Sequence, residues 1–157
     1  FALETLDLPA DGPLRERLMN LYRTLGTFPE VPGVLRALRE AGFATAILSN
    51  GSPDMLASAV EGAGLAGAFD AVISVDEVGN FKPDPRVYQR AVDRLGVPAE
   101  AIAFQSSNAW DAHAASAFGM RVVWCNRYSQ RRERLPGIPD YEIHSLAELP
   151  ALLATQG

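Results

Sequence analysis

The sequence predicts an α/β fold built on a doubly wound parallel sheet. Short apolar segments alternate with helical patterns about every 20 to 30 residues, which is the spacing of strand–helix–strand units. The apolar segments are continuous rather than alternating, as in strands that helices cover on both faces. The chain has 157 residues and is 48% apolar, which suits a single domain with a buried core.

The first elements follow from spacing and from punctuation by proline and glycine. Apolar residues at helical intervals predict a helix over residues 14–25. Pro32 lies near the first position of the next helix, and Gly42 closes it, at the helix ends where these residue types are favoured. The continuous apolar run 43–48 then predicts the first strand.

The later elements repeat this pattern. Pro83-Asp84-Pro85 introduces a helix that Gly96 closes, and Ser145 stands where it would cap the last helix. The sequence predicts further helices over residues 53–61, 83–95, 112–118 and 146–153, and further strands over residues 71–74, 101–104 and 120–124. Roughly the first 30 residues show only helical patterning, so we expect a helical unit ahead of the sheet.

Composition and charge exclude several classes of function. The net charge is −5, whereas a nucleic-acid surface needs clustered positive charge. The basic run 131–134 is interrupted by an acid, and we expect it to be a solvated loop. No segment approaches the roughly 18 apolar residues of a membrane span. The only cysteine, Cys125, lies in an apolar strand pattern, so we expect a buried thiol and a reducing, cytoplasmic location. We therefore expect no nucleic-acid and no membrane partner.

Three polar groups each follow a predicted strand: Ser49-Asn50, Lys82 and the run 106–111. Parallel strands end at one edge of their sheet, so we expect these groups to meet in one cleft, where open α/β sheets bind ligands. Hydroxyl donors and a compact ammonium charge suit an anionic ligand. Asp111 is placed to take a proton from water as a general base. Helix capping explains one polar residue of the run, but it does not explain Ser-Ser-Asn together with an aspartate.

Three motifs in this order resemble those of the haloacid dehalogenase superfamily. They are Leu-Ser-Asn-Gly-Ser at 48–52, Phe-Lys-Pro-Asp-Pro-Arg-Val-Tyr at 81–88 and Ser-Ser-Asn-Ala-Trp-Asp at 106–111. The last motif is the most specific, and it resembles the L-2-haloacid dehalogenase branch. The resemblance runs from about Leu14 to the end of the chain. It implies a Rossmann-like core with a helical cap.

The same motif bears on cofactors. Phosphatases of the superfamily usually carry Gly-Asp-Ser-x-x-Asp there and bind Mg²⁺ through carboxylates, the hard ligands that this cation prefers. Ser107 stands in place of one such aspartate, so the resemblance implies no metal and no cofactor. Residues 62–67 match G-x-G-x-x-G, but they follow a predicted helix rather than a strand. We therefore expect a turn there and no dinucleotide.

The resemblance implies hydrolytic dehalogenation of small (S)-2-haloacids to (R)-2-hydroxyacids through an aspartyl ester, a form of covalent catalysis. Lys82 would neutralise the nucleophile and its ester, and Asp111 would orient or activate the hydrolytic water. The implied catalytic set is Lys82, Ser106, Asn108 and Asp111. The implied substrate-binding set is Ser49, Asn50, Tyr88 and Trp110. The partner would be a small 2-haloalkanoic acid, and the family is commonly homodimeric.

The sequence departs from the family in two places. The nucleophilic aspartate of the family stands in Asp-x-Tyr-Gly-Thr-Leu on an N-terminal strand, and this motif does not occur here. We therefore expect residues 1–28 to be the remnant of a helical cap, and residues 29–157 to be a core without its first strand. Such a chain would be inactive alone. The second departure is His113, where many relatives carry a small residue, and we expect it to pack its helix.

Two alternatives remain open at this point. One is another hydrolase of the same fold, acting on a different carbon–heteroatom bond or on a phosphate ester. The other is a catalytically inactive fragment that binds small acids or another chain, which the missing motif favours.

Overall fold

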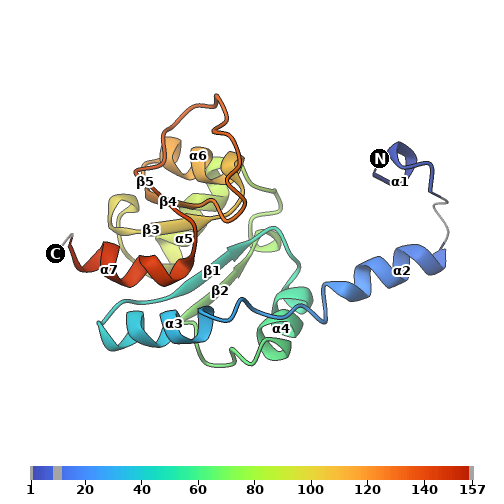
Figure 1. The fold of residues 1–157 in the computed structure, drawn as a ribbon, viewed down its shortest axis with the longest axis horizontal. Helices are drawn as coiled ribbons and strands as arrows, with labels where there is room; N and C mark the ends of the chain where they lie inside the picture. The colour runs from blue at the N-terminus through green and yellow to red at the C-terminus, as the bar shows by residue number, and fades with distance from the viewer. Residues whose placement is uncertain (1, 9–11, 156–157) are drawn as a thin grey trace.

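Parallel strands in two groups form the centre of the molecule in the computed structural model, which describes residues 2–8 and 12–155 (Figure 1). β1 (Ala46–Ser49) pairs with β2 (Ala71–Ser74). The second group has the order β3 (Ala103–Ser106), β4 (Arg121–Cys125) and β5 (Tyr141–Ile143). Every pairing is parallel, which confirms the predicted α/β class. Within the described residues, however, β1 and β3 share no ladder, so the sheet is in two parts.

Helices connect the strands in the predicted alternation. The α-helices of this part are α3 (Val31–Glu40), α4 (Pro53–Gly62), α5 (Pro85–Leu95), α6 (Ala109–Phe118) and α7 (Leu149–Ala154). Three short 3₁₀ turns lie between them: η1 (Val75–Glu77), η2 (Ala99–Ala101) and η3 (Leu146–Glu148).

The side chains of β4 show that helices cover both faces of its sheet. Val122 and Trp124 are buried with residues of α5 and α6. Their neighbours Val123 and Cys125 are buried with residues of α3 and α7. Successive strand residues point to opposite faces, so each face carries its own apolar layer. Cys125 is a buried free thiol, as expected, and burial raises its pKa.

The N-terminal segment stands apart from this core. α1 (Ala2–Thr5) and α2 (Gly12–Leu21) project away from the body in Figure 1, and α2 has no buried residue. The predicted helix over 14–25 ends at Leu21, and residues 25–28 have no regular structure. The expectation of purely helical structure there is therefore wrong after Leu21. Of the predicted cap remnant 1–28, residues 1 and 9–11 lie outside the described residues.

Two strands begin later than predicted because local turns take their first amides. The Phe43 N–H donates to the Leu38 carbonyl and closes α3, so the predicted strand 43–48 starts at Ala46 instead. The Ala101 and Ile102 amides donate to the Pro98 and Ala99 carbonyls, three residues earlier, in the turn η2. The predicted strand 101–104 therefore starts at Ala103 instead. Backbone amides used in a turn are not available to a ladder.

Other boundaries differ by smaller amounts. α6 starts at Ala109 rather than at residue 112, so Trp110 and Asp111 lie in its first turn. β4 is displaced by one residue from the predicted 120–124. β5 is too short and too polar to show as an apolar run, and it was not predicted. Among the described helices, none has the length and apolar character needed to cross a membrane.

Candidate active site

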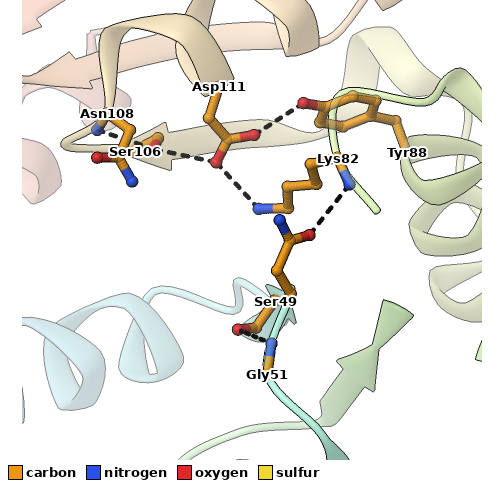
Figure 2. Close-up of polar contacts among 8 residues, drawn as sticks. Ser49, Gly51, Lys82, Tyr88, Ser106, Asn108 and Asp111 are labelled. Carbon is orange, nitrogen blue, oxygen red and sulfur yellow. Dashed lines mark hydrogen bonds and ion pairs between the residues drawn. The ribbon is translucent and has the colours of Figure 1, made fainter. Parts of the chain in front are cut away.

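The carboxylate of Asp111 is the centre of the polar cluster (Figure 2). Lys82 Nζ lies 3.0 Å from its Oδ2, and the Ser106 hydroxyl donates to the same oxygen at 3.0 Å. The Tyr88 hydroxyl donates to Oδ1 at 2.8 Å. The side chains of Lys82 and Asp111 are only 7% and 6% exposed. One buried carboxylate is thus held by three donors, which offset the cost of burying a polar group.

Four different elements supply these groups. Ser106 is the last residue of β3, and Asp111 lies in the first turn of α6, where an acidic side chain is favoured by the helix dipole. Tyr88 lies on α5, and Lys82 lies in the loop before it. Lys82 follows β2 of the first group of strands, whereas Ser106 and Asp111 belong to β3 of the second group and to the helix after it. Polar residues from both groups therefore meet at the carboxyl edge of the strands, as predicted.

Lys82 is positioned from two further sides. Its backbone N–H donates to Asn50 Oδ1 at 3.0 Å, which ties the loop after β1 to the loop before α5. Its ammonium lies 5.0 Å from the centre of the Phe104 ring, a cation–π distance. The sequence indicated Asn50 as a substrate-binding residue, but it did not indicate Phe104. Phe104 lies two positions before Ser106 on β3, so the two side chains point to the same face of the sheet. This alternation along the strand is the sequence signal that could have identified Phe104.

The other predicted residues lie at the edge of this cluster. Asn108 is the N-cap residue of α6, but its side chain makes no capping bond, and its backbone N–H donates to the Ser106 hydroxyl at 3.2 Å. The Ser49 hydroxyl accepts from the Gly51 N–H at 3.0 Å in the turn after β1. Figure 2 shows Ser49 and Asp111 on opposite sides of Lys82. The assignment of Asn108 to catalysis and that of Ser49 to substrate binding stay predictions.

Tyr88 is fully buried, with edge contact to the Phe104 ring and a tilted contact to Phe118. Burial, together with the neighbouring Asp111 carboxylate, raises the pKa of its phenol well above the usual value. Tyr88 therefore acts toward Asp111 as a hydrogen-bond donor and not as a phenolate. The apolar half of its ring belongs to the core, and the polar end belongs to the site.

Trp110 and His113 lie on the side of α6 that borders a cavity, and neither forms a hydrogen bond with the Asp111 cluster among the described residues. Trp110 is 37% exposed. His113 is buried, and its Nδ1 donates to the Gly137 carbonyl at 2.7 Å. This contact supports the expected packing role for His113, since the ring fastens a loop to the helix.

A second ionic cluster at this edge was not predicted. Arg127, just after β4, lies 2.7 Å from Glu30 and stacks 3.8 Å from the centre of the Phe28 ring. Ser145 also donates to Glu30 at 3.2 Å. The pKa of Glu30 is lowered by its own backbone N–H and then by Arg127. These contacts fasten the start of α3 to the carboxyl edge of β4, and no local pattern connects residues so far apart.

The donor set decides what this site can hold. Within the described ranges, no three His, Cys, Asp or Glu side chains lie together as a metal would require. The Ser107 carbonyl accepts the Trp124 indole N–H at 3.3 Å. In chemical terms the cluster offers one carboxylate that accepts a proton, one ammonium that balances negative charge, and hydroxyls that orient small polar groups.

Comparisons with known proteins agree on one family. Residues 3–119 match the model of the haloacid dehalogenase-like hydrolases. The chain is 46% identical over 153 residues to (S)-2-haloacid dehalogenase 1 of Pseudomonas sp. (strain CBS-3), and the match covers 98% of this chain and 67% of that protein.

Solved structures give the same result. An L-2-haloacid dehalogenase, RSc1362, superposes with a TM-score of 0.92 at 42% identity, covering 98% of this chain and 67% of that one. The L-2-haloacid dehalogenase of Xanthobacter autotrophicus, with chloropropionic acid covalently bound, has a TM-score of 0.90 at 34% identity, covering 99% and 72%. The chain thus spans about two thirds of the length of the first two proteins.

Proposed function

Because this chain belongs to the haloacid dehalogenase-like hydrolase family, we propose that its polar cluster serves the hydrolysis of the carbon–halogen bond in small (S)-2-haloacids. The observation that carries the proposal is the Asp111 carboxylate, held by Lys82, Tyr88 and Ser106 where the strands end. The substrate class is supported by 46% identity to an enzyme named (S)-2-haloacid dehalogenase.

In the first step a carboxylate oxygen attacks C2 of the substrate. A carbon–oxygen bond forms as the carbon–halogen bond breaks, the halide leaves with the bonding electron pair, and C2 is inverted. Asp111 is the only carboxylate in the cluster among the described residues, and its oxygens are engaged by donors. The proposal therefore assigns the nucleophilic attack to a second aspartate, which is not present in this cluster among the described residues. The Xanthobacter relative, whose structure holds chloropropionic acid covalently, supports an ester intermediate.

In the second step water attacks the carbonyl carbon of the ester. An ionised carboxylate has about four acceptor positions, and three of those on Asp111 are filled by Lys82, Tyr88 and Ser106. The remaining position is available to orient the water and take its proton. The Lys82 ammonium stabilises the negative charge that develops on the ester oxygen. The bond between the carbonyl carbon and the ester oxygen then breaks, the departing alkoxide takes the proton from Asp111, and the (R)-2-hydroxyacid leaves as the nucleophilic carboxylate is regenerated.

The proposal includes catalysis without a metal. Ser107 offers a neutral hydroxyl where a phosphatase of this superfamily would place a carboxylate. A neutral oxygen is a weaker ligand for Mg²⁺, and it repels a carboxylate substrate less than an aspartate would.

A hybrid enzyme tests the proposal. The third of (S)-2-haloacid dehalogenase 1 that has no counterpart here is joined to these 157 residues, and chloride release is measured with (S)- and (R)-2-chloropropionate in EDTA. We expect release from the (S) isomer alone, with (R)-lactate as product, and none from the 157-residue chain by itself.

Two results would contradict this assignment. A folded hybrid that hydrolyses 4-nitrophenyl phosphate with Mg²⁺ but releases no chloride would favour the phosphatase alternative. A folded hybrid that acts on neither substrate would favour the inactive acid-binding alternative. The same hybrid with Lys82→Ala is the matched control, and it should lose chloride release.

A further inference from the structure

The turn after β1 contains the only asparagine of the sequence that a glycine follows, in the pair Asn50-Gly51. Asparagine is one of the thermolabile residues of proteins, because the next backbone nitrogen can attack its side-chain amide carbon. A following glycine favours this attack, since it has no Cβ to crowd the nitrogen. The Asn50 residue is exposed, so that solvent water and hydroxide reach the pair.

Contacts of the fold favour both residues of this pair. Oδ1 of Asn50 accepts the Lys82 N–H at 3.0 Å, which ties the turn to the loop before α5. A Cβ on Gly51 would lie 3.1 Å from Cδ2 of Leu56, closer than carbon atoms normally pack. One contact thus uses the amide, and the other uses the absence of a side chain. The reactive pair is therefore part of the construction of the site.

Hydrogen bonds restrain the two groups that would react. The Gly51 N–H donates to the Ser49 hydroxyl at 3.0 Å (Figure 2), and the Gly51 carbonyl accepts from the Ser74 hydroxyl at 2.7 Å. The nitrogen must give up this proton to attack, and the Asn50 side chain is held by its bond to Lys82. Hydrogen bonds in a surface turn open from time to time, so these bonds slow the reaction without preventing it.

We propose that Asn50 is a self-modification site of the folded protein. The Gly51 nitrogen forms a bond to Asn50 Cγ as the bond from Cγ to Nδ2 breaks, and ammonia leaves with the proton from Gly51. Water then opens the five-membered succinimide. Cleavage between the nitrogen and Cγ gives aspartate, and cleavage between the nitrogen and the main-chain carbonyl carbon gives isoaspartate. Water is the only co-reactant.

Either product changes the surroundings of Lys82. Aspartate at position 50 adds a negative charge beside the polar cluster, where Asp111 is the one carboxylate among the described residues, and such a charge repels an anionic ligand. Isoaspartate adds a methylene to the backbone before Gly51, which displaces the acceptor of the Lys82 N–H. The modification thus ages the site. Its chemistry is independent of the proposed dehalogenation, so either proposal can fail without the other.

Mass spectrometry of the 157-residue chain, kept folded in a mildly alkaline buffer made with H₂¹⁸O, tests the proposal. We expect the fragment with Asn50 to lose ammonia and gain labelled water. In urea, which removes the restraining bonds, conversion should be at least about tenfold faster. Hydrogen exchange of the Lys82 amide should be faster in the modified chain than in the fresh chain. Four asparagines that no glycine follows are internal controls and should not change: Asn20, Asn80, Asn108 and Asn126.

Matched variants separate the turn from other causes. Ser49→Ala frees the Gly51 N–H and should speed conversion of the folded chain about fivefold, the effect of one hydrogen bond. Ser116→Ala, which removes a hydroxyl bonded to Ile138 on α6, should leave the rate unchanged. Asn50→Gln keeps an amide but would need a six-membered ring to react, so it should show no conversion at position 50.

Several outcomes would overturn the proposal. Conversion of another asparagine, with Asn50 unchanged, would show that this pair is not the reactive one. No conversion of the folded chain after about a hundred half-lives of the denatured chain would show that the fold blocks the reaction. An unchanged rate in Ser49→Ala would refute the restraint on the Gly51 nitrogen. A modified chain whose Lys82 amide exchanges no faster would refute the effect on the loop.

Discussion

The Tyr88 hydroxyl donates a hydrogen bond of 2.8 Å to Oδ1 of Asp111, which lies 23 positions further along the chain. The bond joins α5 to the first turn of α6. It occupies one carboxylate oxygen, while Lys82 and Ser106 share the other. Each of the three partners thus holds the Asp111 carboxylate through its own contact, and single substitutions can measure the effect of each contact.

Replacing Asp111 with Asn in the hybrid enzyme should separate the two chemical steps. The amide cannot take the proton of the hydrolytic water, so ester hydrolysis should slow by about 10²-fold or more, the usual effect of losing a general base. The alkylation step does not use this proton. Mass spectrometry of the enzyme reacting with (S)-2-chloropropionate should therefore show an added 1-carboxyethyl group, the ester-bound substrate without its chloride, that accumulates.

The matched control is Asp93→Asn on the exposed side of α5, where the Asp93 side chain accepts a hydrogen bond from Gln89. It should leave turnover unchanged. Undiminished turnover in Asp111→Asn would remove Asp111 from its proposed role.

Replacing Lys82 with Met should destabilise the 157-residue chain by about 3 kcal/mol, because it leaves a buried carboxylate with one partner fewer. Urea denaturation measures this loss of the free energy of unfolding. The double variant Lys82→Met/Asp111→Asn should lose less than the sum of the two single changes, since the unpaired charge is then absent. Additive losses would show that the two side chains do not interact.

The phenol of Tyr88 should make the chain less stable at high pH. Its pKa is raised in the folded state, whereas in the unfolded state it is about 10. Above that pH the unfolded chain loses a proton that the folded chain keeps. The free energy of unfolding should therefore be unaffected by this group below pH 10 and then fall, by up to about 1.4 kcal/mol per pH unit.

Urea denaturation of the chain and of Tyr88→Phe at several pH values isolates this contribution. The difference in the free energy of unfolding between the unchanged chain and Tyr88→Phe should narrow as the pH rises past about 10. A difference that is constant with pH would show that Tyr88 ionises equally in both states.

Replacing Gly137 with Ala tests the attachment of the loop to α6. The φ angle of Gly137 is 80°, and its Cβ would meet the His113 carbonyl and the Ala117 nitrogen. Gly79 has a φ of 69° with nothing within 4 Å of its Cβ position, so Gly79→Ala carries the backbone penalty alone. We expect Gly79→Ala to lower the free energy of unfolding by about 1 kcal/mol, and Gly137→Ala to lower it by more. Urea denaturation of both variants measures the two losses. Equal costs would show that the loop moves away from α6 freely.

Much of the fold was accessible from the sequence, because its signals are local. β2 was predicted at its observed bounds, and α5 was predicted from the proline and glycine at its ends. The strand starts at Ala46 and Ala103 were missed because turn hydrogen bonds compete for the preceding amides. β5 was missed because three residues of mixed polarity carry no periodicity.

Part of the candidate site could likewise be predicted from the sequence, and part of it could not. Residue types and strand ends predicted that Lys82, Ser106 and Asp111 would meet, and the structure brings them within hydrogen-bond distance. The sequence did not predict that Asn50 holds the Lys82 backbone or that Arg127 stacks on Phe28. These pairs come from elements whose relative placement depends on how the helices pack.

The sequence by itself determined the strand–helix alternation, the residues at the strand ends and the resemblance to a family, since each depends on neighbours along the chain. Only the tertiary structure decided which oxygen of Asp111 takes which donor, and that Tyr88 stands between the polar cluster and the cavity. It also decided that the parallel strands form two groups. Contacts between distant residues follow from the packing of the whole core, which no local pattern encodes.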